Sequence, residues 1–181
     1  MYFVRNTFFL LIMLTESYAW AVPSSTLTVN GLVSSSTCSV DIDGMSESTV
    51  NMNKFPVSDF TGKGIMLGGK EFSLNFNGCE SNGDGFVHME LTPLGIISSI
   101  DKTVLLPSSG TAQNVGFAFT SDDTGSSAII FEGSKQTSRH KWKVDATGRA
   151  KGLFKVYYKS LDIPVRPGTL KASMMATIIY H

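Results

Sequence analysis

The two cysteines, Cys38 and Cys79, have the plainest chemistry in this sequence. Within one molecule they can pair only with each other. An oxidising compartment favours a disulfide between such thiols, whereas the cytosol keeps them reduced. In the chain-entropy model, a disulfide that closes a loop of this length contributes on the order of 4 kcal/mol. The compartment therefore decides whether the two are bonded, and two separate buried thiols are the alternative.

The three histidines give little support to a catalytic site. His88 lies on the polar side of an alternating segment, His140 lies in a basic stretch, and His181 is the last residue. Neither a Gly-x-Ser-x-Gly motif nor a His-x-x-x-His spacing accompanies them. We therefore expect no enzymatic activity, no metal ion, no other cofactor and a solvated side chain at His88. An exported hydrolase would need one of these histidines and has no supporting motif.

Two further segments have types of residue that bind ligands. The segment Asp41–Gly44 resembles the start of a calcium loop, but the later carboxylates of such a loop are absent, so we interpret it as a turn. The run Arg139–Lys143 surrounds Trp142 with cations, and an exposed Trp can stack on a base or a sugar. Strand alternation places Lys141 and Lys143 on one face and Trp142 on the other, so we expect Trp142 in the core. A secreted carbohydrate-binding β-sandwich module that uses Trp142 is the alternative function.

The N-terminal residues have the composition of a secretory signal. Arg5 precedes the apolar run 8–14, and Ala19 and Ala21 are the small residues that a signal peptidase requires. The apolar run is too short to span a bilayer. We therefore expect a signal peptide over residues 1–21, cleavage after Ala21, and an exported mature chain with a disulfide between Cys38 and Cys79.

The composition fits one globular domain. The chain has 181 residues, of which 42% are hydrophobic and 17% charged, so it can form a core. The formal net charge of +0 gives no electrostatic reason to expect nucleic acid or an anionic membrane as a partner. We likewise expect no small-molecule substrate.

Short alternating segments are the elements that must position these residues. In each of them apolar and polar side chains alternate, which is the period of a strand with one buried face. Turn residues separate them, and helical periodicity is absent, so the sequence predicts an all-β fold, an antiparallel sandwich. Residues 52–69 are expected to form an irregular edge segment with loops. The predicted strands are 25–33, 38–42, 72–76, 87–91, 115–119, 154–158 and 170–180, with shorter pieces at 129–131 and 142–144.

The last predicted strand poses a physical problem because the sequence ends with it. If the sandwich lacks one strand, its core is open along a groove, and unpaired edges and exposed apolar surface aggregate. A strand from another chain can fill such a groove by β-strand addition. At ~3.3 Å per residue the segment 25–33 spans about 30 Å and the last strand about 36 Å, so the lengths match. The apolar positions of the last strand are Leu170, Ala172, Met174, Ala176, Ile178 and Tyr180.

Over the whole mature chain, several features together resemble the chaperone–usher pilins, the type 1 fimbrial protein family. The most specific of them is a glycine near the C-terminus that is followed by alternating apolar residues up to a penultimate tyrosine. The short N-terminal extension resembles that of minor or adapter subunits, although Ser25 stands where the family often has an apolar residue. The features are, in chain order, Thr26–Gly31, the spacing of Cys38 and Cys79, Gly110–Gly116, Asp122-Asp123, Gly168 and Tyr180.

This resemblance implies an incomplete immunoglobulin-like sandwich that lacks its last strand and is completed by a donor strand from a partner. The implied organisation is a signal peptide at 1–21, a donor-strand extension at 22–34 and a pilin domain at 35–181. In the donor strand, Gly31 would allow a close approach to the groove floor. The implied donor residues are Leu27, Val29, Gly31 and Val33. The implied acceptor and chaperone-binding residues are Gly168, Leu170, Ala172, Met174, Ala176, Ile178, Tyr180 and His181.

The resemblance also implies the partners. A periplasmic pilus chaperone would lend a strand to the groove and bind the terminal carboxylate of His181 with basic side chains. An outer-membrane usher would then exchange that strand for the extension of a neighbouring pilin subunit, in a homopolymer or a heteropolymer. The implied function is that of a structural subunit of an adhesive pilus, exported through the periplasm to the fimbrium on the bacterial surface, where it contributes to cell adhesion.

Overall fold

The computed structural model describes residues 38–80, 85–132 and 137–179, which belong to one compact unit, Ser34–His181. Its strands pair antiparallel, and its helices are two short 3-10 turns. In chain order the elements are β1 (Ser39–Ile42), η1 (Val57–Asp59), β2 (Met66–Asn77), β3 (Phe86–Pro93), β4 (Val104–Leu105), β5 (Ser109–Gly110), β6 (Val115–Ser121), η2 (Asp122–Thr124), β7 (Ser138–Lys143), β8 (Ala150–Ser160), β9 (Leu170–Lys171) and β10 (Met174–Ile179).

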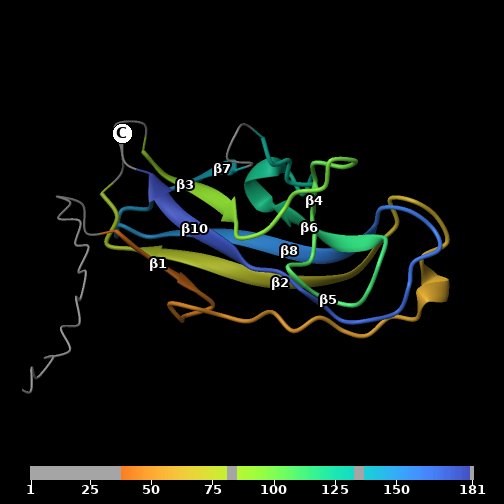
Figure 1. Cartoon of the computed structure of the whole chain (residues 1–181). Helices are drawn as coiled ribbons and strands as arrows, with labels where there is room; N and C mark the ends of the chain where they lie inside the picture. The colour runs from red at the N-terminus through yellow and green to blue at the C-terminus, as the bar shows by residue number, and fades with distance from the viewer. Residues whose placement is uncertain (1–37, 81–84, 133–136, 180–181) are drawn as a thin grey trace, which may run out of the picture. The chain divides into compact units, whose positions relative to one another are not determined.

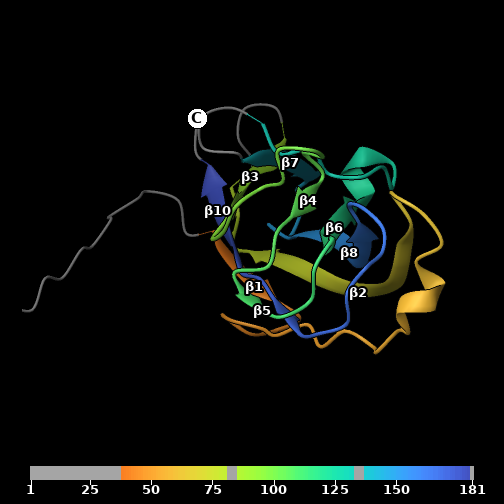
Figure 2. The ribbon, with the colours of Figure 1, turned by 45° about the vertical axis from the view of Figure 1, so that its right-hand side comes forward.

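Two main sheets make up this unit (Figure 1). The first has five strands in the order β1-β2-β8-β6-β4, and the second has three in the order β10-β3-β7. The two-residue strands β5 and β9 form a third, small sheet. The predicted all-β antiparallel sandwich is confirmed. Figure 2 gives a second view of the two layers. None of the described helices is long and apolar enough to cross a membrane.

The core lies between the two main sheets and follows the predicted alternation. From the five-stranded sheet, Phe76 of β2 and Phe154 of β8 are buried, and from the three-stranded sheet Met89 of β3 is buried. Aromatic contacts join the layers, since Phe76 stacks on Trp142 of β7 with ring centroids 5.4 Å apart. Alternating apolar residues on facing sheets therefore make one continuous core.

Strand β2 corrects one expectation. Residues 52–69 were expected to be irregular, but β2 begins at Met66 and includes Gly68 and Gly69. The pairing with β8 shifts register between Leu67 and Lys70, so the two glycines form a bulge in a continuous strand. Gly68 has a φ of 73°, a conformation that favours glycine, and a Cβ atom there would lie 2.5 Å from the ring of Phe55. The glycines mark a close contact and not the end of the strand.

Candidate functional site

Strand β10 lies at the edge of its sheet. It pairs with β3, with Met174 opposite Pro93 and Ile179 opposite His88, and it is the outermost member of the order β10-β3-β7. The short strand β9 precedes it and pairs with β5. The C-terminal strand predicted from the sequence therefore forms as β9 and β10, and each has one strand partner among the described residues.

Backbone hydrogen bonds show which side of β9 and β10 is occupied. Leu94 N donates to Ser173 O over 2.9 Å, and Ser108 N donates to Lys171 O over 2.8 Å. Bonded residues alternate along an antiparallel strand, so the odd-numbered residues direct their backbone groups toward β3 and β5. The even-numbered residues direct theirs to the opposite side, where none of the described strands pairs with them. One row of backbone donors and acceptors therefore remains available along Leu170–Ile178.

The side chains of the same even-numbered residues form an apolar row that is only partly covered. They pack against the core cluster but are half-buried. In the neighbouring strand β3, Val87, Met89 and Leu91 are 3%, 0% and 3% exposed. The inward side chains are therefore fully buried on β3 and partly exposed on β10. We call these five residues the apolar row: Leu170, Ala172, Met174, Ala176 and Ile178.

A second set of half-buried apolar side chains follows the start of the described chain. Val40 and Ile42 lie on β1, which is the edge strand of the five-stranded sheet, and Val50 and Met52 lie in the segment after it. Both views place β1 and β10 on the same side of the sandwich (Figures 1 and 2). The core is therefore least covered on the side where the edges of the two sheets meet.

The other edge of the three-stranded sheet, β7, is protected. Arg139, Lys141 and Lys143 are exposed and place a cation at every second position, which opposes pairing with another strand. The carboxylate of Asp123 in η2 also accepts a hydrogen bond from Lys141 N over 3.1 Å. Strand β10 contains no charged residue. The two edges of one sheet therefore differ in whether they oppose the addition of a strand.

Two glycines, Gly110 and Gly168, allow the backbones around β5 and β9 to approach closely. A Cβ atom at Gly110 would lie 2.0 Å from Thr169 O, and one at Gly168 would lie 2.3 Å from Ala112 N. Both distances are too short for a real side chain, so glycine is required where these segments cross. Gly168 was predicted to belong to the acceptor strand, and the structure places it just before β9, where it sets the approach of the 108–112 segment.

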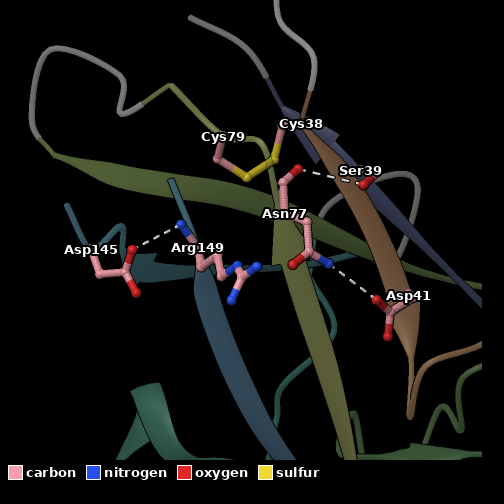
Figure 3. The surroundings of a disulfide bond; sticks show 7 residues. All are labelled: Cys38, Ser39, Asp41, Asn77, Cys79, Asp145 and Arg149. Atoms are coloured by element: carbon pink, nitrogen blue, oxygen red, sulfur yellow. Dashed lines mark hydrogen bonds between the residues drawn. A yellow bond between two sulfur atoms is a disulfide. The ribbon is translucent and has the colours of Figure 1, made fainter. Parts of the chain in front are cut away.

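The disulfide between Cys38 and Cys79 is present, as predicted (Figure 3). It joins the residue before β1 to Cys79, which follows the end of β2, next to a hydrogen bond of 3.2 Å from Asn77 Nδ2 to Asp41 Oδ2. Asp41 Oδ1 also accepts a bond of 2.7 Å from Gly44 N, so the segment Asp41–Gly44 is the predicted turn. The described residues contain no group of three His, Cys, Asp or Glu side chains that could hold a metal ion.

Trp142 lies in the core, as the strand alternation predicted. It is 6% exposed, and its Nε1 donates to Asp122 Oδ1 over 2.8 Å. A buried indole offers no face to a sugar, so the alternative function as a carbohydrate-binding module has no platform at this residue. The neighbouring Lys141 and Lys143 are exposed on the opposite face.

His140 has a role that sequence reasoning missed. Its Nδ1 lies 2.9 Å from Asp123 Oδ1, and its Nε2 lies 3.1 Å from Ser138 Oγ. Burial by itself raises the pKa of Asp123, but hydrogen bonds from His140 and Ser121 outweigh burial and lower this pKa below its ordinary value. The His140 side chain is 0% exposed, so the Ser-His-Asp arrangement cannot meet a substrate and instead ties η2 to β7. No motif in the sequence connects residues so far apart in the chain.

Several predicted site residues lie outside the described part of the chain. They are the donor residues Leu27, Val29, Gly31 and Val33, and the terminal residues Tyr180 and His181. Their roles stay predictions. His88, for which a solvated side chain was expected, is half-buried on β3.

Three solved structures with this fold are similar to the chain. The P pilus rod subunit PapA has a TM-score of 0.55 at 14% identity, covering 78% of this chain and 99% of PapA. A type I fimbria protein of Burkholderia pseudomallei has a TM-score of 0.55 at 19% identity, covering 80% of this chain and 100% of that one. The CupB6 tip adhesin of Pseudomonas aeruginosa has a TM-score of 0.55 at 14% identity, covering 67% of this chain and 33% of the adhesin. This chain therefore spans about a third of that adhesin.

These identities are low, so the three likenesses concern the fold alone. A comparison with curated protein sequences gives no match. A family model described as "Fimbrial protein" matches residues 25–181, which is most of the sequence. The match includes the disulfide, the two main sheets and the edge formed by β9 and β10. The chain therefore belongs to the fimbrial protein family.

Proposed function

We propose that this protein is a structural subunit of a bacterial adhesive pilus whose sandwich is completed by a strand from another chain. The observation that carries the proposal is the free side of β9 and β10, where unpaired backbone groups and the apolar row coincide along Leu170–Ile178. A strand added there would bond to the even-numbered backbone groups and cover the half-buried side chains in the same step.

The contrast between the two edges of the three-stranded sheet supports this proposal. Natural sheets protect their free edges with charge or with a covering segment. Strand β7 has both, through its lysines and Asp123, whereas β10 has neither within the part of the chain that the structure describes. An apolar edge of this kind in an exported protein leads to aggregation unless a dedicated strand covers it.

The proposed route of assembly uses partners at three stages. A signal peptide at 1–21 directs export, and a periplasmic chaperone supplies the first covering strand and binds the carboxylate of His181. At the outer-membrane usher, the extension 22–34 of a neighbouring subunit replaces the chaperone strand on the pilin domain, 35–181. The product is a fimbrium on the cell surface that contributes to adhesion.

The energetics favour replacement by a donor with aliphatic side chains. Burying Leu27, Val29 and Val33 contributes roughly 1.5–3 kcal/mol for each side chain. The backbone bonds form a continuous ladder, and each adds about 1 kcal/mol net. Because these contacts must break together, release of the donor is slow.

A rearranged chain tests the proposal. In it, residues 22–34 are moved behind His181 and joined by a short linker, so that the extension can fold back antiparallel to β10. We expect a monomer that unfolds at a higher temperature, and more slowly in denaturant, than the mature chain in its native order. Thermal unfolding and size-exclusion chromatography measure both properties.

The matched control carries Val29→Asp and Val33→Asp in the moved extension. Two carboxylates in apolar positions carry a large desolvation cost, so the control should lose the added stability. A native-order chain that is a stable monomer, together with a rearranged chain that gains nothing over this control, would rule out strand addition.

A further inference from the structure

A row of polar side chains crosses three strands of the five-stranded sheet. Asp41 of β1 pairs in register with Asn75 of β2, and Asn75 pairs with Lys151 of β8. The adjacent residues Phe76 and Ala150 are buried in the core. Because side chains alternate between the two faces of a strand, the three polar side chains lie on the outer face of the sheet.

Arg149 and Asn77 extend this row toward the disulfide. Phe76 pairs with Ala150, so the next residues along the two strands, Asn77 and Arg149, are neighbours on the outer face. Figure 3 shows the guanidinium of Arg149 directed toward the side chain of Asn77. Together with Lys143 at the end of β7, the row lines a hollow of about 520 Å³, which we call the polar hollow. Its volume is in the range of small-molecule sites.

Asp41, one of two carboxylates that line the polar hollow, is already engaged in hydrogen bonds. Its Oδ1 accepts bonds of 2.7 Å from Gly44 N and 2.8 Å from Asn75 Nδ2, and its Oδ2 accepts one of 3.2 Å from Asn77 Nδ2. These bonds use the amide nitrogens of both asparagines. The two amide oxygens, Asn75 Oδ1 and Asn77 Oδ1, have no hydrogen-bond donor among the described residues and can accept bonds from a ligand.

The second carboxylate, Asp145, lies in the turn between β7 and β8. Its Oδ1 accepts bonds from Thr147 N and Thr147 Oγ1, each over 2.7 Å, and from Arg149 N over 3.1 Å. The bonds from Thr147 and Arg149 lower the pKa of Asp145 below its ordinary value, and the charge of Arg149 contributes less. The turn therefore fixes the backbone from which the Arg149 side chain extends.

The three cations of the polar hollow lack such partners. Further along β8, Lys155 Nζ lies 2.8 Å from Glu71 Oε1. In contrast, the side chains of Lys143, Arg149 and Lys151 form no hydrogen bond or ion pair within the part of the chain that the structure describes. All three are exposed, and against two carboxylates they leave one positive charge in excess. The hollow therefore offers a ligand both free cationic donors and neutral acceptors.

We propose that the polar hollow binds an acidic sugar, whose carboxylate contacts Arg149 and whose hydroxyl groups contact the amide oxygens of Asn75 and Asn77. A guanidinium can form two parallel hydrogen bonds with a carboxylate, which an ammonium group cannot. Lys143 and Lys151 add positive charge around the bound anion. The free amide oxygens need donors, and a sugar acid supplies hydroxyl donors and a carboxylate in one molecule.

The two fixed carboxylates argue against a polyanion such as a nucleic acid. Asp41 and Asp145 would repel a chain of closely spaced negative charges, whereas a single carboxylate can be placed on Arg149. This inference goes beyond the proposed function, because it concerns the outer face of β1, β2 and β8 and requires no strand from another chain. In a pilus, such a site would let subunits along the fibre contribute to adhesion.

Titration of the purified mature protein with single sugars tests this inference. The probes are N-acetylneuraminic acid and glucuronic acid, the methyl ester of each, acetate, and a short single-stranded oligonucleotide. We expect at least one of the two acids to bind with a dissociation constant on the order of 1 mM in calorimetry. Its ester, which lacks the charge, and acetate, which lacks the hydroxyl groups, should bind at least about ten-fold more weakly. The acid that binds more tightly identifies the source.

Two glutamine substitutions locate the binding site. Arg149→Gln removes the guanidinium and should weaken binding of the acid at least about ten-fold. The matched control, Lys155→Gln, removes the same charge from an exposed position of β8 outside the polar hollow. It should change the affinity by less than about two-fold, because distant surface charges are screened. Thermal unfolding of both variants shows whether they fold like the wild-type protein.

Several results would overturn the sugar site. If neither acid binds to the folded wild-type protein, or if acetate binds as tightly as the acids, the hollow does not recognise a sugar. Equal losses in the two variants would mean that binding follows the overall charge and not the hollow. Tighter binding of the oligonucleotide would assign the surface to a polyanion. None of these results depends on whether the rearranged chain gains stability, so the test is separate from that of strand addition.

Discussion

Half-buried carboxylates join segments of this protein that are far apart in the sequence. Lys159 Nζ of β8 lies 2.8 Å from Asp101 Oδ2, and Asp101 Oδ1 accepts bonds of 2.7 Å and 3.0 Å from the side chain and backbone of Thr103. Burial by itself raises the pKa of Asp101, but the hydrogen bonds from Lys159 and Thr103 outweigh burial and lower this pKa to about 2. Asp101 therefore holds the loop before β4 against β8.

The substitution Asp101→Asn should make the stability less dependent on pH. The folded-state pKa of Asp101 lies below its unfolded value, so its ionised form stabilises the folded state above about pH 4 and this contribution is lost as the pH falls toward 2. Because the group is partly exposed, we expect a loss of at most about 2 kcal/mol at pH 7. Urea unfolding at several pH values measures it, with Asp59→Asn on the exposed η1 as a control. A difference from wild type that stays constant down to pH 2 would contradict this role.

At single positions, the sequence predicts the face of a residue better than its partner. Alternation placed Trp142 in the core, and composition with export predicted the disulfide of Cys38 and Cys79. The contact of His140 with Asp123 was not predicted, because it depends on how η2 crosses β7, and strand periodicity contains no information on crossings. The hydrogen bond between His140 and Asp123 could be found only from the positions of the strands in the folded protein.

At the scale of elements, the C-terminal strand is positioned by its crossing with the 108–112 segment. Thr111 N donates to Thr169 O over 2.9 Å, and the glycines at 110 and 168 allow the two backbones to approach. The small sheet of β5 and β9 therefore holds the first residue of the apolar row, Leu170, against the core. Backbone packing at the start of the strand therefore explains Gly168, the glycine in the C-terminal motif that resembles the family.

The substitution Gly168→Ala should destabilise the protein. The added methyl group would lie 2.3 Å from a backbone nitrogen, which cannot rotate away, so β9 or the 108–112 segment must shift. We expect a loss of about 1–3 kcal/mol in the free energy of unfolding, as for other overpacked sites. The matched control is Gly62→Ala, where a Cβ atom would meet nothing within 4 Å. Equal effects of the two substitutions in denaturant unfolding would show that the crossing at Gly168 is not constrained.

Element boundaries were less predictable than element types. The strands around residues 74, 89, 117, 156 and 176 were each predicted, since their alternation is regular. The predicted start of β2 was wrong because Gly68 and Gly69 on their own indicate a turn. In the folded protein they form a bulge within the strand, in contact with Phe55 and Tyr157. Two-residue strands such as β4 and β5 are too short to have a period.

At the scale of the whole molecule, the disulfide fixes the start of the described chain to the core. Cys79 is 5% exposed, and its N donates to Gly148 O over 2.8 Å, so this half of the bond is already held in place. Cys38 precedes β1, an edge strand of four residues whose one partner among the described strands is β2. The bond therefore keeps β1 and the adjacent half-buried residues on the side where strand addition is proposed.

The double substitution Cys38→Ala/Cys79→Ala should destabilise the whole domain. Opening this loop restores conformational entropy to the unfolded chain, and the expected loss is on the order of 4 kcal/mol. Denaturant unfolding of the double variant and of the reduced wild-type protein measures it, and the two should agree. A loss below about 1 kcal/mol in both would mean that strand pairing alone holds β1.

The difference between the edges of β7 and β10 has a consequence for the kinetics of growth. In the proposed assembly each molecule would offer one reactive edge and one reactive segment, so it would behave like a difunctional monomer in polymer chemistry, with unlike end groups. Such monomers give unbranched chains with a direction, and the number of chains equals the number of unreacted ends of either kind. Fibre length would therefore be set by the supply of a terminating unit that has one of the two groups, and not by the strength of the joint.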